Sequence, residues 1–296
     1  MTADEATETE RIERALEGVN AGYIAEMQER WRGDPTSVEP EWRALFEPAI
    51  APAPAAQGAE PPATEASAAA AEVATAVLPG GATPLRGPAA RLARNMTASL
   101  TVPTATSFRD VEVATLEARR RELIAQLAPR RVSFTHLIGF AIARAASEQP
   151  GMTASYLEAD GAAYRVDPAG VNLGLAVDVE RPDGGRFLVV PVIRAADAMD
   201  FAAFHARYEE QVEKARSNRL SPDDMAGATI TLTNPGTLGT TASVARLMPG
   251  QGAIVASGAI RAVGASRVMT ISSTYDHRVI QGAESGAFLG RIDALL

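Results

Sequence analysis

The chain has 296 residues, of which 46% are hydrophobic, and it carries a formal net charge of −8. This length allows one large domain or two small ones with a buried core, and the negative charge argues against a nucleic-acid partner. The sequence has no uninterrupted apolar run of about 18 residues, so no transmembrane helix is expected. The acidic N-terminus also lacks the apolar stretch of a secretory signal. We therefore expect a cytoplasmic protein without a membrane partner.

Three residue types limit the chemistry. Cysteine is absent, which excludes disulfides, thiolate nucleophiles and cysteine zinc sites. The three histidines, His136, His205 and His277, are far apart in the sequence and lack the spacing of metal ligands, so we expect no metal site. Lys214 is the only lysine and lies in a charged helical pattern, which argues against Schiff-base chemistry, a Walker phosphate loop and a lipoyl-carrying lysine.

Residues 1–47 predict two helices. Apolar residues recur at three- and four-residue steps over 9–31, and a second short pattern covers 40–46. Two short helices bury little apolar surface by themselves, so aromatic side chains such as Trp31 and Trp42 are expected to dock on another surface. A partner protein is the favoured surface, and the alternative is a helical cap on this same chain.

Residues 48–84 have a different composition. Alanine and proline dominate between 51 and 80, and no helical or strand period is present. This composition predicts a flexible, partly extended linker between the N-terminal helices and the rest of the chain.

Residues 85–296 predict one domain in which helices alternate with strands. Helical patterns cover 85–100, 114–128, 133–150, 198–218 and 282–296. Strand patterns cover 103–113, 170–179, 186–193, 229–234, 252–260 and 267–276, and a hairpin over 156–166 has its turn at Asp160–Gly161. The order predicts an α/β fold in two layers.

The stretch S-T-Y-D-H-R-V-I-Q-G, residues 273–282, places His277 between a predicted strand and a predicted helix. Loops that follow strands often carry reactive groups in α/β folds. Asp276 and Arg278 make the loop polar between two apolar runs, and such groups need partners or a purpose. From these residues alone, a structural histidine that is bonded to the backbone is the simpler interpretation.

A second polar strand end is found in T-I-T-L-T-N-P-G, residues 229–236. The hydroxyl of Thr233 and the amide of Asn234 are groups that can donate to an oxyanion. An ordinary Asx-type turn explains the same residues, and it is favoured when this motif is considered alone.

Taken in this order, the two motifs resemble the catalytic domain of the E2 components of 2-oxo acid dehydrogenase complexes. These dihydrolipoamide acyltransferases have a two-layer, chloramphenicol-acetyltransferase-like fold, and the resemblance covers 85–296. It implies His277 as the catalytic base, Thr233 as the oxyanion donor and supporting roles for Asp276, Arg278 and Asn234. Asp276 and Arg278 are expected to pair and to hold the loop. Near the start of the domain, the resemblance also includes four matching positions: Arg86, Ser99, Pro103 and Thr106. Arg86 and Ser99 are expected to bind coenzyme A or substrate.

The N-terminal helices resemble the N-terminal segment of 2-oxoglutarate dehydrogenase E1, which docks E1 onto the E2 core in that family. An E1-type segment, an Ala/Pro linker and an E2-type domain follow one another in the actinobacterial multifunctional 2-oxoglutarate dehydrogenase/decarboxylase. A thiamine-diphosphate region comes next in that type. This chain stops at Leu296 and has no thiamine signature, so we expect a truncated or split version that carries only the acyltransferase part and no thiamine diphosphate site.

The resemblance implies transfer of succinyl from S-succinyl-dihydrolipoamide to coenzyme A within the 2-oxoglutarate dehydrogenase complex of the tricarboxylic acid cycle. A thiol with a pKa near 8.5 needs a base at neutral pH, and a histidine, which ordinarily titrates near 6.5, can supply one. The implied active site lies between subunits of a homotrimer. The implied partners are the E1 2-oxoglutarate dehydrogenase, a second E2 protein that supplies the lipoamide, and the E3 dihydrolipoamide dehydrogenase.

Gln281 departs from most of the family, which has aspartate at this position. The amide keeps a hydrogen-bonding group but loses the charge, and the fused actinobacterial type shares the change, so its catalytic role stays open. One alternative is therefore a catalytically weak trimeric core that docks E1 and other components. Another is a free-standing acyltransferase with a different acyl specificity.

Overall fold

A computed structural model of the protein describes residues 20–47, 81–180 and 186–296. The first half of the helix predicted over 9–31, nearly all of the predicted linker and most of the turn between 179 and 186 lie outside these residues. The helices are α2 (Ala21–Gly33), α3 (Pro40–Phe46), α4 (Gly87–Ser99), α5 (Ala114–Leu127), α6 (Phe134–Glu148), α7 (Phe201–Arg216) and α8 (Gly282–Leu295). None of them is long and apolar enough to span a membrane.

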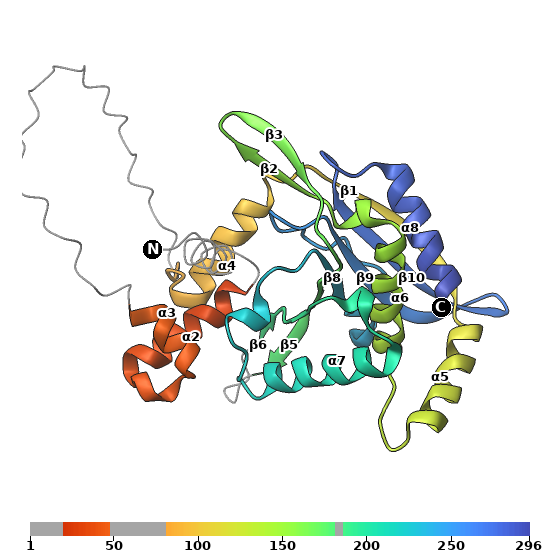
Figure 1. The fold of residues 1–296 in the computed structure, drawn as a ribbon, viewed down its shortest axis with the longest axis horizontal. Coiled ribbons are helices and arrows are strands. Elements are labelled where there is room, and N and C mark those ends of the chain that lie inside the picture. Colours follow the sequence, from red (N-terminus) through yellow and green to blue (C-terminus); the bar gives the residue numbers. More distant parts are fainter. Residues whose placement is uncertain (1–19, 48–80, 181–185) are drawn as a thin grey trace, which may run out of the picture.

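The strands form one large and two small sheets (Figure 1). The six-stranded sheet has the order β1-β10-β9-β8-β4-β7, and its β4–β8 and β8–β9 pairs are parallel while the others are antiparallel. Hairpins β2–β3 and β5–β6 form the small sheets. The strand bounds are β1 (Thr104–Glu112), β2 (Ser155–Ala159), β3 (Ala162–Val166), β4 (Leu173–Leu175), β5 (Val177–Glu180), β6 (Arg186–Val189), β7 (Val192–Ile193), β8 (Ile230–Thr233), β9 (Ala253–Val263) and β10 (Ser266–Asp276).

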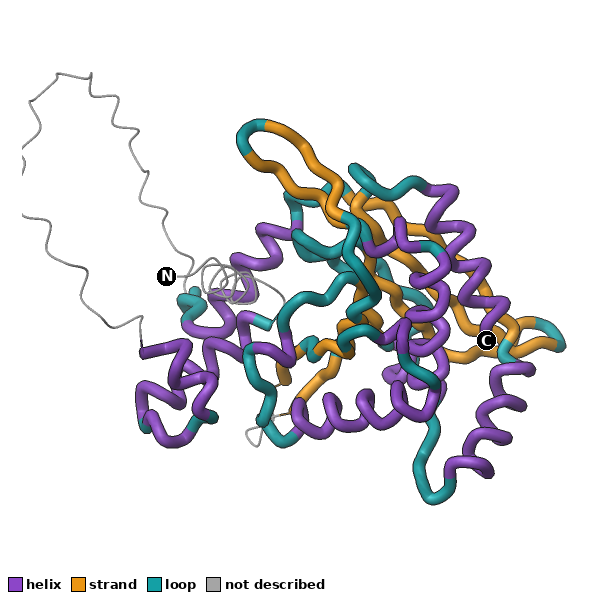
Figure 2. The backbone as a smooth tube through the Cα atoms, viewed as in Figure 1, coloured by secondary structure: helices purple, strands orange, loops and turns teal. Residues whose placement is uncertain are grey.

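Figure 2 shows how the helices and strands alternate in space, and most of the predicted elements are present within a few residues of their predicted ends. The predicted hairpin turn is also confirmed. Asp160 and Gly161 both have positive φ angles, 52° and 73°, which a two-residue hairpin turn of this type requires and which aspartate and glycine tolerate.

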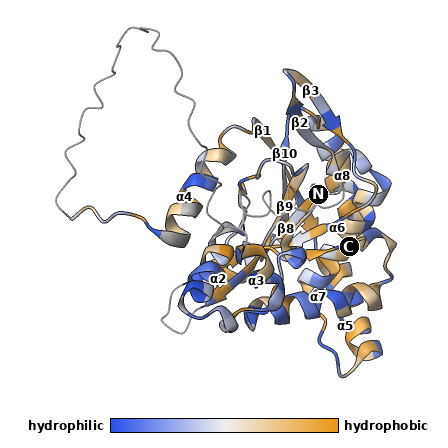
Figure 3. Cartoon of the chain, turned by 60° about the vertical axis from the view of Figure 1, so that its left-hand side comes forward, coloured by the Kyte–Doolittle hydropathy of each residue, from blue (hydrophilic) through white to orange (hydrophobic). Residues whose placement is uncertain are grey.

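The main core lies between the six-stranded sheet and helices α6 and α8. Alternate side chains of β10 point toward these helices because successive residues of a strand face opposite sides. The core contains Met269, Ile271 and Tyr275 from β10, Ile142 from α6 and Phe288 from α8, and Figure 3 shows that much of α6 is hydrophobic. Burying a large apolar side chain of this kind contributes about 1.5–3 kcal/mol.

The opposite face of β10 is lined by hydroxyl groups. Thr270, Ser272 and Thr274 alternate along it and are all buried. The hydroxyl of Thr274 lies 2.8 Å from that of Thr106 on β1, and the Ser272 hydroxyl donates to the Ser243 carbonyl at 2.7 Å. Strand β10 therefore has an apolar face toward the helices and a polar face on its other side.

The two strands predicted over 170–179 and 186–193 are each divided in the structure. The inner halves, β4 and β7, belong to the six-stranded sheet, and the outer halves pair separately as β5 and β6. The division on the second strand falls at Val190, whose N–H donates to the Asn20 Oδ1 at 2.6 Å and whose carbonyl accepts from the Asn20 Nδ2 at 3.1 Å. A side chain from the N-terminal segment thus takes the place of a neighbouring strand, which a strand pattern alone does not reveal.

Helices α2 and α3 form a cap on this same chain. Their apolar side chains pack with β5, β6 and the segment after α7 in a second core. Trp42 donates from its Nε1 to the Leu220 carbonyl at 2.8 Å, and the Tyr23 hydroxyl accepts from the Leu220 N–H at 3.2 Å. The aromatic side chains of this cap are therefore buried within the chain, which is the alternative that the sequence left open rather than the favoured partner surface.

Candidate active site

His277 begins the loop between β10 and α8. Its backbone N–H donates to the Pro103 carbonyl, just before β1, at 2.9 Å. Its ring lies with its centroid 5.5 Å from that of Tyr275 in an edge contact, and the residue is exposed. The backbone of His277 is thus fixed at the edge of the sheet while its imidazole is open to a substrate.

The predicted pair of Asp276 and Arg278 is present. The Asp276 carboxylate is almost fully buried and accepts from the Arg278 Nε at 2.9 Å, from its Nη2 at 2.6 Å and from its backbone N–H at 3.1 Å. A buried carboxylate is tolerated when a guanidinium meets it with two parallel bonds. The hydrogen bond to Asp276 also holds the pKa of Arg278 above its usual range, so the two residues form a closed ion pair that bends the chain around His277.

Gln281 is the N-cap residue of α8. Its backbone N–H donates to the Glu284 Oε2 at 2.7 Å, and its carbonyl accepts from the Ser285 N–H at 3.1 Å. The first bond satisfies the N–H of the N-cap residue, and the second is the first regular hydrogen bond of the helix. The backbone of Gln281 therefore starts the helix, and its exposed side chain lies four residues after His277.

Thr233 is the last residue of β8, one residue before the predicted end of the strand, and Asn234 follows it at the start of the turn. The Asn234 Nδ2 donates to the Thr135 hydroxyl at the start of α6 at 2.8 Å, a partner that the sequence did not indicate. The turn that follows lies directly on β9, because a Cβ placed on Gly236 would come within 2.3 Å of the Gly258 backbone. Only glycine fits that approach, so the turn fixes where the half-buried Thr233 lies.

The structure keeps Thr233 and His277 apart within one chain. Thr233 is paired with Ala256 on β9, and Ala256 is paired with Ser272 on β10. His277 lies five residues beyond Ser272, which corresponds to roughly 17 Å along the strand at about 3.4 Å per residue. His277 also follows a strand that is two strands away from the one that carries Thr233. One chain therefore cannot bring both groups to one carbonyl.

The two expected binding residues, Arg86 and Ser99, lie at opposite ends of α4. Arg86 precedes the first turn and is exposed, whereas Ser99 ends the helix, is buried and donates its hydroxyl to the Met96 carbonyl at 2.7 Å. A helix of this length spans about 20 Å. Ser99 is thus close in the chain to Pro103, which holds His277, and Arg86 is remote from it.

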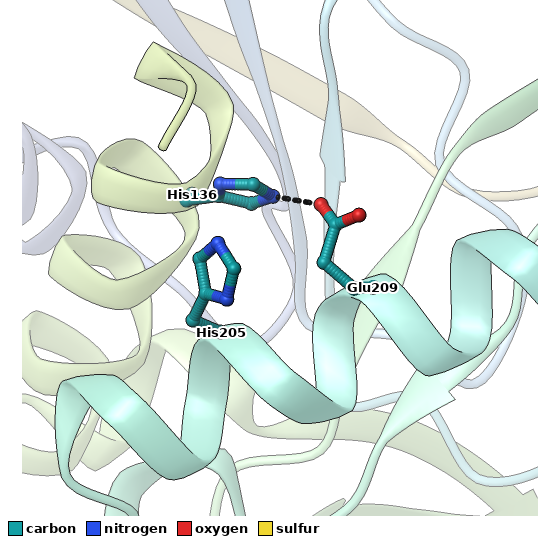
Figure 4. Close-up of side chains that lie close together, drawn as sticks. All are labelled: His136, His205 and Glu209. Carbon is teal, nitrogen blue, oxygen red and sulfur yellow. Dashed lines mark ion pairs between the residues drawn. The ribbon is translucent and has the colours of Figure 1, made fainter. Parts of the chain in front are cut away.

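Two of the three histidines meet in the structure, contrary to what their separation in the sequence suggested. His136 on α6 and His205 on α7 have ring centroids 4.4 Å apart, and the His136 Nε2 lies 2.7 Å from the Glu209 Oε1 (Figure 4). Packing of α6 on α7 brings them together, which sequence spacing cannot show.

This cluster has hydrogen bonds that do not fit a metal ion. The His136 Nδ1 accepts from the Ser133 N–H at 3.1 Å, so the neutral ring carries its proton on Nε2 and donates it to Glu209. The His205 Nε2 donates to the Arg131 carbonyl at 2.8 Å. A metal at the His136 Nε2 would have to displace that proton from a ring whose other nitrogen is already engaged.

Replacing His136 by glutamine is expected to flatten the pH dependence of stability. Burial lowers the pKa of His136 to about 4, so between about 6.5 and about 4 the unfolded chain binds a proton that the folded chain does not. The free energy of unfolding therefore falls as the pH drops through this window, by up to about 3 kcal/mol. Glutamine can keep the helix-capping bonds with Ser133. Urea unfolding at several pH values measures the difference, and an unchanged slope in His136→Gln would contradict it.

Two family models match the chain. The model for 2-oxoacid dehydrogenases acyltransferase (catalytic domain) matches residues 80–296, and the model for the 2-oxoglutarate dehydrogenase N-terminus matches residues 13–49. The chain is 47% identical over 229 residues to the multifunctional 2-oxoglutarate metabolism enzymes of Mycolicibacterium vanbaalenii and Mycobacterium sp. strain JLS. The match covers 72% of this chain but only 18% of either protein. The resemblance to the fused actinobacterial type is thereby confirmed.

Solved structures of E2 catalytic domains share the fold. The cubic core of the pyruvate dehydrogenase multienzyme complex matches with a TM-score of 0.61 at 32% identity, over 69% of this chain and 85% of that one. The Azotobacter vinelandii dihydrolipoamide acetyltransferase, studied for the catalytic roles of a serine, a histidine and an asparagine, matches with a TM-score of 0.62 at 32% identity, over 70% and 87%. A catalytic core from Thermoplasma acidophilum gives 0.64 at 26% identity, over 72% and 96%. These matches confirm the predicted E2 fold.

Proposed function

Because the chain belongs to the 2-oxoacid dehydrogenase acyltransferase family, we propose that it transfers succinyl from S-succinyl-dihydrolipoamide to coenzyme A. The observation that carries the choice of acyl group is the N-terminal segment, which matches the 2-oxoglutarate dehydrogenase model. Loss of carbon dioxide from 2-oxoglutarate leaves a succinyl group. Both coenzyme A and the lipoamide are substrates, and the lipoyl arm comes from another protein.

His277 acts as the base in this proposal. The imidazole takes the proton of the coenzyme A thiol, and the resulting thiolate attacks the thioester carbonyl. Negative charge then develops on the former carbonyl oxygen, where a hydroxyl donor is worth roughly 3 kcal/mol in comparable sites. Thr233 is that donor. When the intermediate collapses, the dihydrolipoamide thiolate leaves and receives the proton from His277, so the enzyme returns to its starting state.

The two groups must come from two copies of the chain, since the sheet keeps Thr233 and His277 roughly 17 Å apart along β10 within one copy. A homotrimer whose neighbouring copies share each site meets this requirement. The match to the cubic core of the pyruvate dehydrogenase complex supports an assembled state.

Gln281 supports His277 in this proposal. In the Azotobacter acetyltransferase, the catalytic histidine and asparagine are four positions apart, which is the spacing of His277 and Gln281 here. Gln281 and the asparagine of the Azotobacter enzyme both carry a neutral amide, so a carboxylate is not needed at this position. The amide can accept or donate a hydrogen bond near the reacting atoms.

The test is coenzyme A-dependent turnover of succinyl-dihydrolipoamide beside acetyl-dihydrolipoamide as a matched donor. We expect kcat/KM to be at least about tenfold higher for succinyl, which corresponds to about 1.4 kcal/mol of differential transition-state binding. Preference for acetyl would replace the succinyl assignment with another acyl specificity. If a well-folded oligomer shows no turnover with either donor, the proposal that the chain is an acyltransferase is rejected.

The second candidate is a core that assembles the complex without turnover of its own. The observation that favours it is the cap, because a segment that matches the 2-oxoglutarate dehydrogenase N-terminus lies on the acyltransferase domain. The same surface of β5, β6 and Leu220 could then receive that segment from a separate E1 chain. The other partners in this candidate are the lipoyl-bearing E2 protein and the E3 dihydrolipoamide dehydrogenase.

A further inference from the structure

The β2–β3 hairpin extends from the body of the molecule and approaches the loop that carries His277 (Figure 1). Tyr156 on β2 lies directly opposite Arg165 on β3 in the hairpin register. Directly paired residues of a hairpin lie close together and share one face of the two-stranded sheet. Each member of this pair contacts a different residue of the His277 loop.

Tyr156 covers the face of the Arg278 guanidinium. The Arg278 Cζ lies 3.8 Å from the centroid of the Tyr156 ring, within the range of a cation–π contact. The Tyr156 hydroxyl donates to the Glu158 Oε2 at 3.2 Å, which restrains the other end of the ring. Since Asp276 binds the edge of the same guanidinium, Arg278 is held both in its plane and from above.

Arg165 holds the next residue of the loop. Its Nη1 donates to the Val279 carbonyl at 2.8 Å, and its Nε donates to the Asp167 Oδ1 at 2.9 Å. The N–H of Val279 in turn donates to the Asp276 carbonyl at 3.2 Å. The two residues that follow His277 are therefore both fixed by one cross-strand pair of a hairpin that is more than 100 residues away in sequence.

We propose that Tyr156 and Arg165 are positioning residues for His277, and that the β2–β3 hairpin is the part of the fold that sets the orientation of the catalytic base. This inference rests on the proposed acyl transfer. The Pro103 contact fixes the loop before the imidazole, and the hairpin fixes it afterwards. An exposed side chain on a loop needs this support, because proton transfer demands hydrogen-bond reach and a shift of about 1 Å can cost on the order of 100-fold in rate.

The test compares Tyr156→Leu with Tyr156→Phe and with Tyr164→Leu as the matched control. Phenylalanine keeps the ring over Arg278. Tyr164 is the neighbouring residue on the same hairpin, lies on its other face and is exposed. We expect Tyr156→Leu to lower kcat by about tenfold or more with the KM for coenzyme A changed by less than about twofold, while the other two variants stay near the native kcat.

A second measurement does not depend on turnover. The chain has three histidines, so the ring signals of His277 can be assigned by NMR in histidine-labelled protein with a His277→Ala sample. We expect these signals to shift or broaden in Tyr156→Leu and to remain native in Tyr156→Phe and Tyr164→Leu. Should the native protein lack turnover, the proposed function fails while the signals still test the positioning role.

Three results would overturn the inference. They are native kcat and native His277 signals in Tyr156→Leu, an equal loss of kcat in Tyr164→Leu, and a loss of kcat in Tyr156→Phe that matches the leucine variant. If Tyr156→Leu does not fold, Arg165→Gln carries the same expectation, since Arg165 is exposed and its removal frees the Val279 carbonyl.

Discussion

His277→Ala is expected to lower kcat for coenzyme A-dependent succinyl transfer by about 10²- to 10⁴-fold, which is the range that a positioned general base contributes. The imidazole is the group in the loop that can accept the thiol proton near neutral pH. Because the thiol binds before its proton is transferred, the KM for coenzyme A should change much less than kcat. Steady-state kinetics with both substrates measure the two effects separately.

The fold of this variant can be checked independently. The His277 side chain is exposed, and the hydrogen bond that its backbone donates to Pro103 is retained with alanine. The thermal midpoint and the oligomeric state should therefore match those of the native protein. A variant that keeps native turnover would show that His277 is a structural residue at the strand end, which was the simpler interpretation of the motif alone.

The local elements could be predicted from the sequence because their signals are local. The alternation of β10 predicts its apolar and polar faces, and Asp160–Gly161 predicts a hairpin turn that only permissive residues adopt. The pairing of Asp276 with Arg278 was also predictable, since the two residues are separated by one position. Each of these inferences needs only neighbours in the chain.

The long-range contacts could not be predicted, because an apolar stripe indicates which side chains must be buried but not which surface buries them. Asn20 meets Val190 across 170 positions, and Trp42 meets Leu220 across 178. His136 and His205 come together only because α6 packs on α7. For the same reason the motifs do not tell how far apart Thr233 and His277 lie. That distance depends on the order and register of three strands.

Mixed oligomers of His277→Ala and Thr233→Val are expected to recover about one quarter of the native activity. Valine keeps the branched shape of threonine and removes the hydroxyl, so Thr233→Val alone should lose on the order of 10²- to 10³-fold. When each site takes its histidine from one copy and its threonine from a neighbour, a random one-to-one mixture has both groups intact at about a quarter of the sites. Co-expression of the two chains in equal amounts, followed by assay of the whole oligomer population without separating mixed from unmixed species, measures this recovery.

The reciprocal mixture is the control. When native chains are mixed one to one with chains that carry both substitutions, a shared site again leaves about a quarter of the sites intact, whereas a site within one chain leaves about half. No recovery in the first mixture and half activity in the second would reject the shared site. That result would require Thr233 and His277 to meet within one copy, which the strand register of the sheet forbids, so the oxyanion donor would then have to be sought among residues on the His277 side of the sheet.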